Sequence, residues 1–213
     1  MNNIIESVKK NKIIVIVRGV AKEKLIPLAE AMYNGGIRLI ECTYQANGSI
    51  SDEEIADNIK MLAEYFGDKM YVGAGTVLTK KQVELTKKAG GKFIISPDAN
   101  EEVIRYTKEI GLISMPGALT PTEIAAAKRA GADFVKVFPI DVYGPSYIKA
   151  VKAPLSNVEL LAVGGITINN INDYLSAGAV GVGIGTGIVN KGMIESGNFE
   201  GITRLAKEYT QKL

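Results

Sequence analysis

The sequence predicts an α/β protein, a single-domain (β/α)8 TIM barrel with a short N-terminal helix. The first observation behind this prediction is an alternation of short apolar runs of strand length with longer segments of helical spacing. The second is a glycine that recurs at the end of the helical segments, directly before the next apolar run. The third is the length of 213 residues, near the short end for such a barrel.

Eight apolar runs are expected to form the strands. Strands joined by helices pair in parallel through right-handed crossovers, and an open doubly wound sheet is the main competing arrangement. Eight units and no obvious break in strand order favour the closed barrel. No linker divides the chain, so residues 1–213 are interpreted as one barrel domain. The expected strands are residues 13–17, 37–41, 70–73, 93–96, 112–115, 133–138, 159–163 and 180–184.

The helical segments carry their own start and stop signals. Ser51, Thr79 and Thr120 are expected N-caps, and Thr120 is followed by Pro121 at N1 and Glu123 at N3. Glycine ends a helix because it adopts the left-handed conformation without steric cost. The expected stop residues are Gly35, Gly36, Gly67, Gly90, Gly91, Gly111, Gly131 and Gly178.

Composition and charge exclude several functional classes. The 25 basic and 23 acidic residues give a net charge of +2 without a clustered basic stripe, so neither nucleic-acid nor membrane partners are expected. The longest apolar runs are too short to span a bilayer, and residues 1–12 lack the features of a signal peptide. The single cysteine, Cys42, excludes an intramolecular disulfide. We therefore expect a cytoplasmic protein.

The chain contains no histidine, which excludes Ser-His and Cys-His catalysis and imidazole metal ligands. It also lacks the glycine-rich motifs of nucleotide-binding loops. Acid–base chemistry must therefore come from other side chains or water, and we expect neither a metal nor a cofactor.

Lys136 is the most unusual residue in any expected strand. Alternation in the run DFVKVF places Phe134, Lys136 and Phe138 on one face. A structural interpretation is a lysine whose stem is buried and whose amine reaches water. In a closed barrel, however, both faces are covered, and an unpaired buried ammonium is costly. Because desolvation lowers a lysine pKa, we favour a nucleophile that forms a Schiff base with a carbonyl.

Two further charged residues close expected strands. Glu41 follows the run IRLI, and Arg18 follows IIVIV. In a structural role Glu41 would cap the next turn or pair with a cation, and Arg18 would pair with Glu41. In a functional role Glu41 would transfer protons in a Schiff-base mechanism, and the guanidinium fork of Arg18 would bind a carboxylate or phosphate.

Glycine-rich segments follow three other strands. A tight turn would explain the glycines of residues 73–76 (GAGT), but small residues would also let a substrate approach the backbone, with the Thr76 hydroxyl as a donor. Gly164 and Gly165 follow the seventh strand, and residues 185–187 (GTG) follow the eighth. Either loop alone indicates only a turn. Because phosphate sites of these barrels are frequently built from these two loops, together they predict a phosphate site.

These residues give the chain a resemblance to the 2-keto-3-deoxy-6-phosphogluconate / 4-hydroxy-2-oxoglutarate aldolases, which are class I enzymes on a (β/α)8 barrel. The resemblance covers nearly the whole length through the motifs VIVRG, LIE, VGAGTVL, FIISPD, SMPGALTPTE, DFVKVFP, YGPSYIKA and AVGGIT, in that order. It implies that Lys136 forms the Schiff base with pyruvate and that Glu41 shuttles protons through a bound water.

The resemblance also implies the rest of the site and the partners. The substrate would be a phosphorylated 2-keto acid cleaved to pyruvate and glyceraldehyde 3-phosphate, with 4-hydroxy-2-oxoglutarate, cleaved to pyruvate and glyoxylate, as a second substrate. Family members are typically homotrimers that need no metal. The residues implied around the pyruvate unit are Arg18, Thr76, Pro97 and Phe138, and those implied at the phosphate are Gly164, Gly165, Gly185 and Thr186.

The chain departs from the family pattern at two positions. Many members have an arginine four residues after the glutamate, where this chain has Gln45, so carboxylate recognition is expected to fall to Arg18, Thr76 and backbone donors. The gluconate-type enzymes commonly have a threonine where this chain has Val163. The stretches AVGGIT and FGDKMYVGAGTVL are closer to the 2-keto-3-deoxy-6-phosphogalactonate aldolases. The preferred substrate therefore stays open among the three.

Two other functions also stay open. A phosphosugar isomerase or epimerase on the same barrel would use Lys136 and Glu41 for proton transfer alone, without an imine. A non-catalytic phosphosugar-binding protein would have kept the barrel without its activity. The intact Lys136 and Glu41 pair speaks against this last alternative, and Gln45 is the one feature in its favour.

Overall fold

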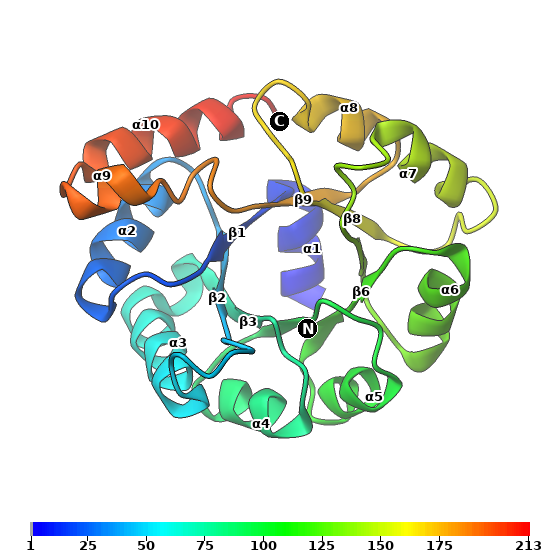
Figure 1. Ribbon diagram of the computed structural model, residues 1–213, viewed down its shortest axis with the longest axis horizontal. Coiled ribbons are helices and arrows are strands. Elements are labelled where there is room, and N and C mark those ends of the chain that lie inside the picture. Colours follow the sequence, from blue (N-terminus) through cyan, green and yellow to red (C-terminus); the bar gives the residue numbers. More distant parts are fainter. Residues whose placement is uncertain (1) are drawn as a thin grey trace.

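Strands and helices alternate along residues 2–213, which are the residues that this computed structural model describes (Figure 1). The strands form one sheet in the order β5-β4-β3-β2-β1-β9-β8-β7-β6, and all paired strands are parallel. The strands are β1 (Ile13–Val17), β2 (Leu39–Thr43), β3 (Tyr71–Gly75), β4 (Phe93–Ile95), β5 (Ile113–Met115), β6 (Gly117–Ala118), β7 (Val135–Val137), β8 (Leu160–Val163) and β9 (Gly181–Ile184).

The ring of strands is completed by β5 and β6, which follow each other in the chain and are separated by Pro116. β5 pairs with β4, whereas β6 pairs with β7 on the other side. The two short strands are therefore halves of one barrel strand that contact opposite neighbours. The predicted (β/α)8 barrel is confirmed, and the open sheet is excluded.

Helices surround the strands on the outside of the barrel (Figure 1). None of the helices in residues 2–213 is both long and apolar enough to cross a membrane. The helices are α1 (Asn2–Asn11), α2 (Lys22–Asn34), α3 (Asp52–Phe66), the short 3-10 helix η1 (Gly67–Lys69), α4 (Lys80–Lys88), α5 (Glu101–Glu109), α6 (Pro121–Ala130), α7 (Pro145–Lys152), α8 (Ile171–Ser176), α9 (Lys191–Glu195) and α10 (Phe199–Thr210).

The predicted N-caps are present in the structure, and the predicted stop glycines are left-handed except Gly35, which caps α2 with a φ of −80°, and Gly91. Ser51, Thr79 and Thr120 cap α3, α4 and α6, and each forms a complete capping box with the residue at N3. Gly131 ends α6 with a φ of 109°, a left-handed conformation that glycine adopts without strain. These signals fix where the loops at the two ends of the barrel begin.

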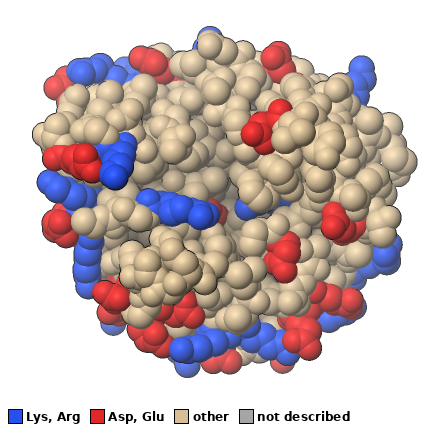
Figure 2. All heavy atoms as spheres, viewed as in Figure 1, with Lys and Arg blue, Asp and Glu red and all other residues tan. Residues whose placement is uncertain are grey.

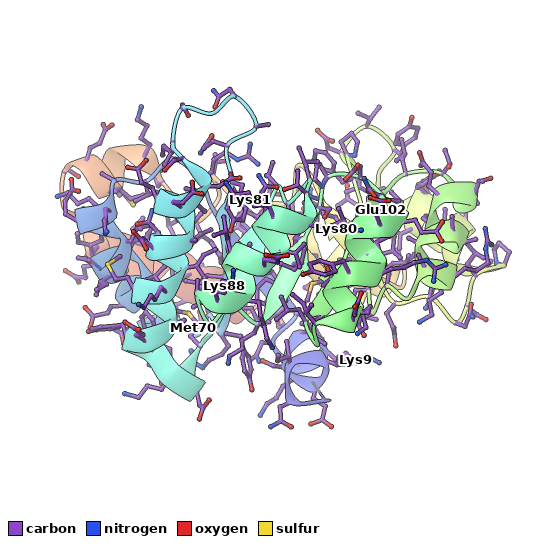
Figure 3. The ribbon with its side chains drawn as sticks, turned by 90° about the horizontal axis from the view of Figure 1, so that it is seen from below. Lys9, Met70, Lys80, Lys81, Lys88 and Glu102 are labelled. Atoms are coloured by element: carbon purple, nitrogen blue, oxygen red, sulfur yellow. The ribbon has the colours of Figure 1, made fainter. Side chains whose placement is uncertain are left out.

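Alternate strand residues face the barrel axis and form an inner apolar layer. Phe134 belongs to this layer, whereas Val135 and Val137 pack outward against the helices, as the alternation predicts. Ile4 and Val8 of α1 join the same inner layer. Because α1 directly precedes β1, it covers the amino-terminal end of the barrel, from which it projects (Figure 3). The opposite end holds the carboxyl ends of the strands.

The bounds of β2 and β3 differ from the prediction. Glu41 is the third residue of β2 and not its last, because pairing with β3 continues as far as Thr43 and Gly75. The glycines expected in a turn after β3 therefore lie largely inside the strand. The Glu41 side chain is consequently deeper in the barrel than the sequence suggested.

The strand that carries Lys136 is shorter than predicted at both ends. The N–H groups of Asp133 and Phe134 both donate to the carbonyl of Ser114, at 3.0 and 3.3 Å, which interrupts the regular ladder. At the other end Pro139 has no N–H with which to extend the pairing. Lys136 is thus the middle residue of a three-residue strand.

Candidate active site

Lys136 lies inside the barrel and is only 8% exposed. Burial lowers the pKa of its amine, the negative charge of Glu41 raises this pKa, and the positive charge of Arg18 lowers it further. The amine nitrogen Nζ lies over the ring of Phe138, 4.6 Å from the ring centre. A buried lysine with a lowered pKa has the properties of a nucleophile.

Glu41 shares a cavity with Lys136. Burial raises the pKa of the Glu41 carboxyl to about 7, although the charges of Lys136 and Arg18 both lower it. The glutamate and the lysine line one cavity of about 10 Å³, close to the smallest volume that holds one water. The remaining walls of this cavity are apolar or lack a side chain: Ile14, Ile16, Ile95, Leu161, Val163 and Gly183. The structure therefore brings the two predicted catalytic residues together.

Gly75 leaves room for the Glu41 carboxylate. In the parallel register Gly75 lies opposite Thr43, two residues beyond Glu41, yet a Cβ at Gly75 would overlap the carboxylate. The glutamate side chain therefore reaches toward the carboxyl end of the barrel. Its oxygen Oε2 is buried and has no hydrogen-bond partner within residues 2–213. An unpaired buried carboxylate oxygen is costly in a purely structural role.

Arg18 and Thr76 form a pair across the mouth of the barrel. The Arg18 Nη2 donates to the Thr76 Oγ1 at 3.0 Å. Because β2 lies between β1 and β3, this hydrogen bond crosses the end of the strand that carries Glu41. The structural interpretation predicted an ion pair between Arg18 and Glu41. Residues 2–213 form no such pair, and the Arg18 guanidinium donates to Thr76 instead. Thr76 has a φ of 56°, a strained conformation that is concentrated at functional sites.

Pro97 contacts the strand next to that of Lys136, and Phe138 directly follows the Lys136 strand. Pro97 follows β4, and its carbonyl occupies the space that a Cβ at Gly117 would need. Gly117 is the register partner of Lys136, so Pro97 lies beside the strand that pairs with the lysine's strand. Phe138 follows β7, and its ring is beside the amine.

The two predicted phosphate loops follow adjacent strands, β8 and β9. Gly164 and Gly165 have φ values of 113° and 64°, which other residues rarely adopt. Gly185 and Thr186 line a cavity of about 590 Å³ together with Arg18. Gly185, Thr186 and Arg18 therefore share one cavity, and the Gly164–Gly165 loop follows the neighbouring strand at the same end of the barrel.

Gln45 is the predicted site residue with the least support from the structure. It is half-buried in the loop after β2, and its side chain makes no hydrogen bond within residues 2–213. The structure does not bring it into a polar contact with the other predicted site residues.

Two residues at the site, Thr43 and Asp141, were not predicted from the sequence, and Gly75 was predicted only as part of the GAGT segment. Thr43 is buried, and its hydroxyl has no hydrogen-bond partner among residues 2–213. Its signal is the continued alternation Leu39, Glu41, Thr43, which places it on the same side of β2 as the glutamate. Asp141, which packs against the Gly164 and Gly165 loop, carried no comparable signal. The room that Gly75 leaves for the Glu41 carboxylate was not predicted either.

The end of the barrel that holds the carboxyl ends of the strands is hollowed near its centre, where basic atoms are visible (Figure 2). Around this hollow, basic and acidic side chains are mixed over the face (Figure 2). Among residues 2–213 no group of three or more His, Cys, Asp or Glu side chains is placed to hold a metal ion.

A family model described as KDPG and KHG aldolase matches residues 4–205. The chain belongs to this aldolase family. The sequence resemblance is thus confirmed, as is the predicted enzyme class, a carbon–carbon lyase of the class I aldolase type.

Relatives and solved structures agree with this assignment. The chain is 34% identical to the 2-dehydro-3-deoxy-6-phosphogalactonate aldolase of Escherichia coli (strain K12), over 86% of this chain and 87% of the relative. It is 31% identical to the 2-dehydro-3-deoxy-phosphogluconate aldolase of Haemophilus influenzae, over 96% and 94%. The KDPG aldolase of Legionella pneumophila, solved with pyruvate captured at low pH as a covalent carbinolamine, has a TM-score of 0.85 at 28% identity, over 95% and 96%.

Proposed function

We propose that this aldolase cleaves a 2-keto-3-deoxy-6-phospho sugar acid to pyruvate and glyceraldehyde 3-phosphate, with Lys136 as the Schiff-base nucleophile. The observation that carries the proposal is the pair of buried groups on one cavity, a lysine of lowered pKa and Glu41, whose pKa is about 7. A neutral amine and a carboxyl group that titrates near neutrality are what an imine-forming lyase requires. The names of the relatives support this class of substrate.

The reaction follows from these two groups. The neutral Lys136 amine attacks the C2 carbonyl, the carbonyl oxygen leaves as water, and a protonated imine forms. The imine accepts the electron pair of the C3–C4 bond, so that this bond breaks without a free carbanion. Glu41, directly or through a water, takes the proton of the C4 hydroxyl and the aldehyde is released. The enamine is then protonated at C3, and hydrolysis frees pyruvate and the lysine.

The substrate carboxylate is assigned to Arg18 and Thr76. Their mutual hydrogen bond holds the guanidinium at the barrel mouth, and a guanidinium and a hydroxyl are both suited to a carboxylate. Gln45, which is uncharged, then serves at most as an additional polar contact. Pro97, beside the strand that pairs with that of Lys136, and Phe138, beside the amine, would cover the apolar methylene of the pyruvate unit.

The phosphate is assigned to the two glycine loops, Gly164–Gly165 and Gly185–Thr186. Backbone N–H groups in such loops can point at an anion, and the Thr186 hydroxyl adds a donor. A clamp on the phosphate would orient the C3–C4 bond over the lysine, so that binding energy contributes to positioning.

Val163 supports the galactonate epimer as the preferred substrate. Its side chain lines the cavity that Lys136 and Glu41 share, and an apolar side chain there cannot hydrogen-bond a hydroxyl at C4. We therefore propose 2-keto-3-deoxy-6-phosphogalactonate as the main substrate, with phosphogluconate and 4-hydroxy-2-oxoglutarate turned over less efficiently.

The function is tested by measuring pyruvate release from both epimers and from 4-hydroxy-2-oxoglutarate. The highest kcat/KM is expected for the galactonate epimer, and Val163→Thr is expected to shift the ratio toward the gluconate epimer. A wild-type protein that releases no pyruvate from any of the three would contradict the proposed function. A ratio that Val163→Thr leaves unchanged would contradict only the role of Val163.

The proposal also covers the oligomeric state of the protein and its cellular compartment. We propose a homotrimer in the cytoplasm, by analogy with the family, and the single buried cysteine is consistent with a reducing compartment. Sedimentation should then give a mass three times the 22.8 kDa of one chain.

A further inference from the structure

Phe138 presents the face of its ring to the amine of Lys136. The nitrogen Nζ lies 4.6 Å from the ring centre. The ring is also 37% exposed, so that it is not held there by burial in the core. None of the ion pairs or hydrogen bonds formed within residues 2–213 involves this amine. The Glu41 carboxylate acts on its charge from the shared cavity, and Phe138 adds an aromatic face that lies directly over the nitrogen.

The charge on this nitrogen changes during the proposed reaction. The face of an aromatic ring attracts a cation that lies within about 6 Å of the ring centre. In imine formation a neutral amine, a ketone and one proton give a protonated imine and one water: the Nζ–C2 bond forms and the carbonyl oxygen leaves. The positive charge then rests on Nζ, in surroundings whose burial disfavours it. A ring face at this distance therefore stabilises the imine more than the neutral amine.

We propose that Phe138 stabilises the protonated imine on Lys136 through a cation–π interaction. This inference rests on the proposed Schiff-base function and adds a group that acts on the reacting nitrogen itself. It also accounts for an aromatic residue that stays partly exposed at the barrel mouth, where an aliphatic side chain could cover the pyruvate unit equally well.

The interaction has a characteristic pH dependence. Above the pKa of the Lys136 amine, imine formation creates a charge beside the ring, so the ring contributes in full. Below this pKa the free amine already carries a charge, and the contribution to reactant and product largely cancels. The charges of Glu41 and Arg18 also act on this nitrogen, but they are the same throughout a series that changes only the electron density of the Phe138 ring. The pH dependence of the differences within such a series therefore reports the ring, and a packing role of Phe138 would leave those differences independent of pH.

The test replaces Phe138 with mono-, di- and trifluorinated phenylalanine. Fluorine withdraws electron density from the ring face in steps, with little change in size. The dissociation constant of the pyruvate imine is obtained from the pyruvate concentration dependence of cyanoborohydride trapping, over a range of pH. The matched control is the same series at Phe134, which lies two residues before Lys136 and is buried in the inner apolar layer.

At alkaline pH the dissociation constant is expected to rise with each added fluorine, by about 3- to 30-fold for the trifluorinated ring. The rise should shrink toward acid pH, and the Phe134 series should show no such trend. Equal constants across the Phe138 series, or a rise that is independent of pH, would overturn the inference. If the unsubstituted protein forms no pyruvate adduct at all, the proposed Schiff-base function fails instead, so the two failures are distinguishable.

Discussion

At the scale of single residues, the site depends on the absence of a side chain at Gly75 as well as on Lys136 and Glu41. A Cβ at Gly75 would overlap the Glu41 carboxylate. We predict that Gly75→Ala lowers kcat about 100-fold, because a displacement of roughly 1 Å in a catalytic group costs this much. The matched variant is Gly73→Ala, whose Cβ would overlap the Phe93 ring.

The two alanine variants separate catalysis from packing. Gly73→Ala should mainly lower the unfolding temperature, because it disturbs the inner apolar layer, whereas Gly75→Ala should mainly lower kcat. Both quantities are measured on each protein. A Gly75→Ala enzyme with wild-type kcat would show that the carboxylate position has no catalytic importance.

Glu41 also makes the stability of the protein depend on pH. Burial raises its pKa from 4.5 to about 7, so the folded state binds this proton more tightly than the unfolded state. The stabilising contribution is therefore complete below pH 4.5 and is lost as the pH rises through about 7. Fully ionised, the buried carboxylate lowers the free energy of unfolding by about 3 kcal/mol relative to its protonated form.

We predict that Glu41→Gln is more stable than the wild type at about pH 8 and that this advantage shrinks toward about pH 5. The measurement is urea unfolding of both proteins at several pH values, with kcat recorded in parallel. The variant should lose most of its lyase activity. A difference in unfolding free energy that stays constant with pH would contradict the assigned burial of the charge.

Lys136 and Glu41 could be predicted from the sequence because a charged residue in an apolar strand is conspicuous. Gly75 could not be identified in the same way, because its importance depends on where the Glu41 side chain turns. The Arg18–Thr76 hydrogen bond also could not be predicted from the sequence, because it depends on the spacing of three neighbouring strands.

At the scale of elements, capping boxes fix where the helices begin. The Thr120 Oγ1 accepts the N–H of Glu123, and the Glu123 carboxylate accepts the N–H of Thr120 at 2.8 Å. We predict that Thr120→Ala lowers the free energy of unfolding by about 1 kcal/mol. The kcat should not change, because both residues are exposed and lie outside the site. Thr120→Ser, which retains the hydroxyl, is the control, and equal stability of the two variants would contradict the capping role.

The number, type and order of the elements could be predicted because apolar periodicity, caps and stop glycines all agree. The strand ends could not, since they are set by pairing with neighbours distant in the chain. The division of one barrel strand at Pro116 is an example: its two halves have different partners, and one strand's own pattern does not contain this information.

At the scale of the whole molecule, barrel closure gathers a site from residues far apart in the sequence. Arg18, Glu41 and Lys136 come from the regions of β1, β2 and β7 and meet at one end, while α1 covers the other. The closed barrel could be predicted from eight repeating units. The apolar cavity that Lys136 and Glu41 share could not be predicted, because no single repeating unit contains all the residues that line it.

The most direct test of the account is mass spectrometry of the protein after incubation with pyruvate and borohydride. We predict a single adduct of the mass of reduced pyruvate, located on Lys136 by peptide mapping and absent from Lys136→Ala. A folded wild-type protein that gains no adduct in excess pyruvate, or gains it on another lysine, would contradict the account and would favour a proton-transfer isomerase on the same barrel.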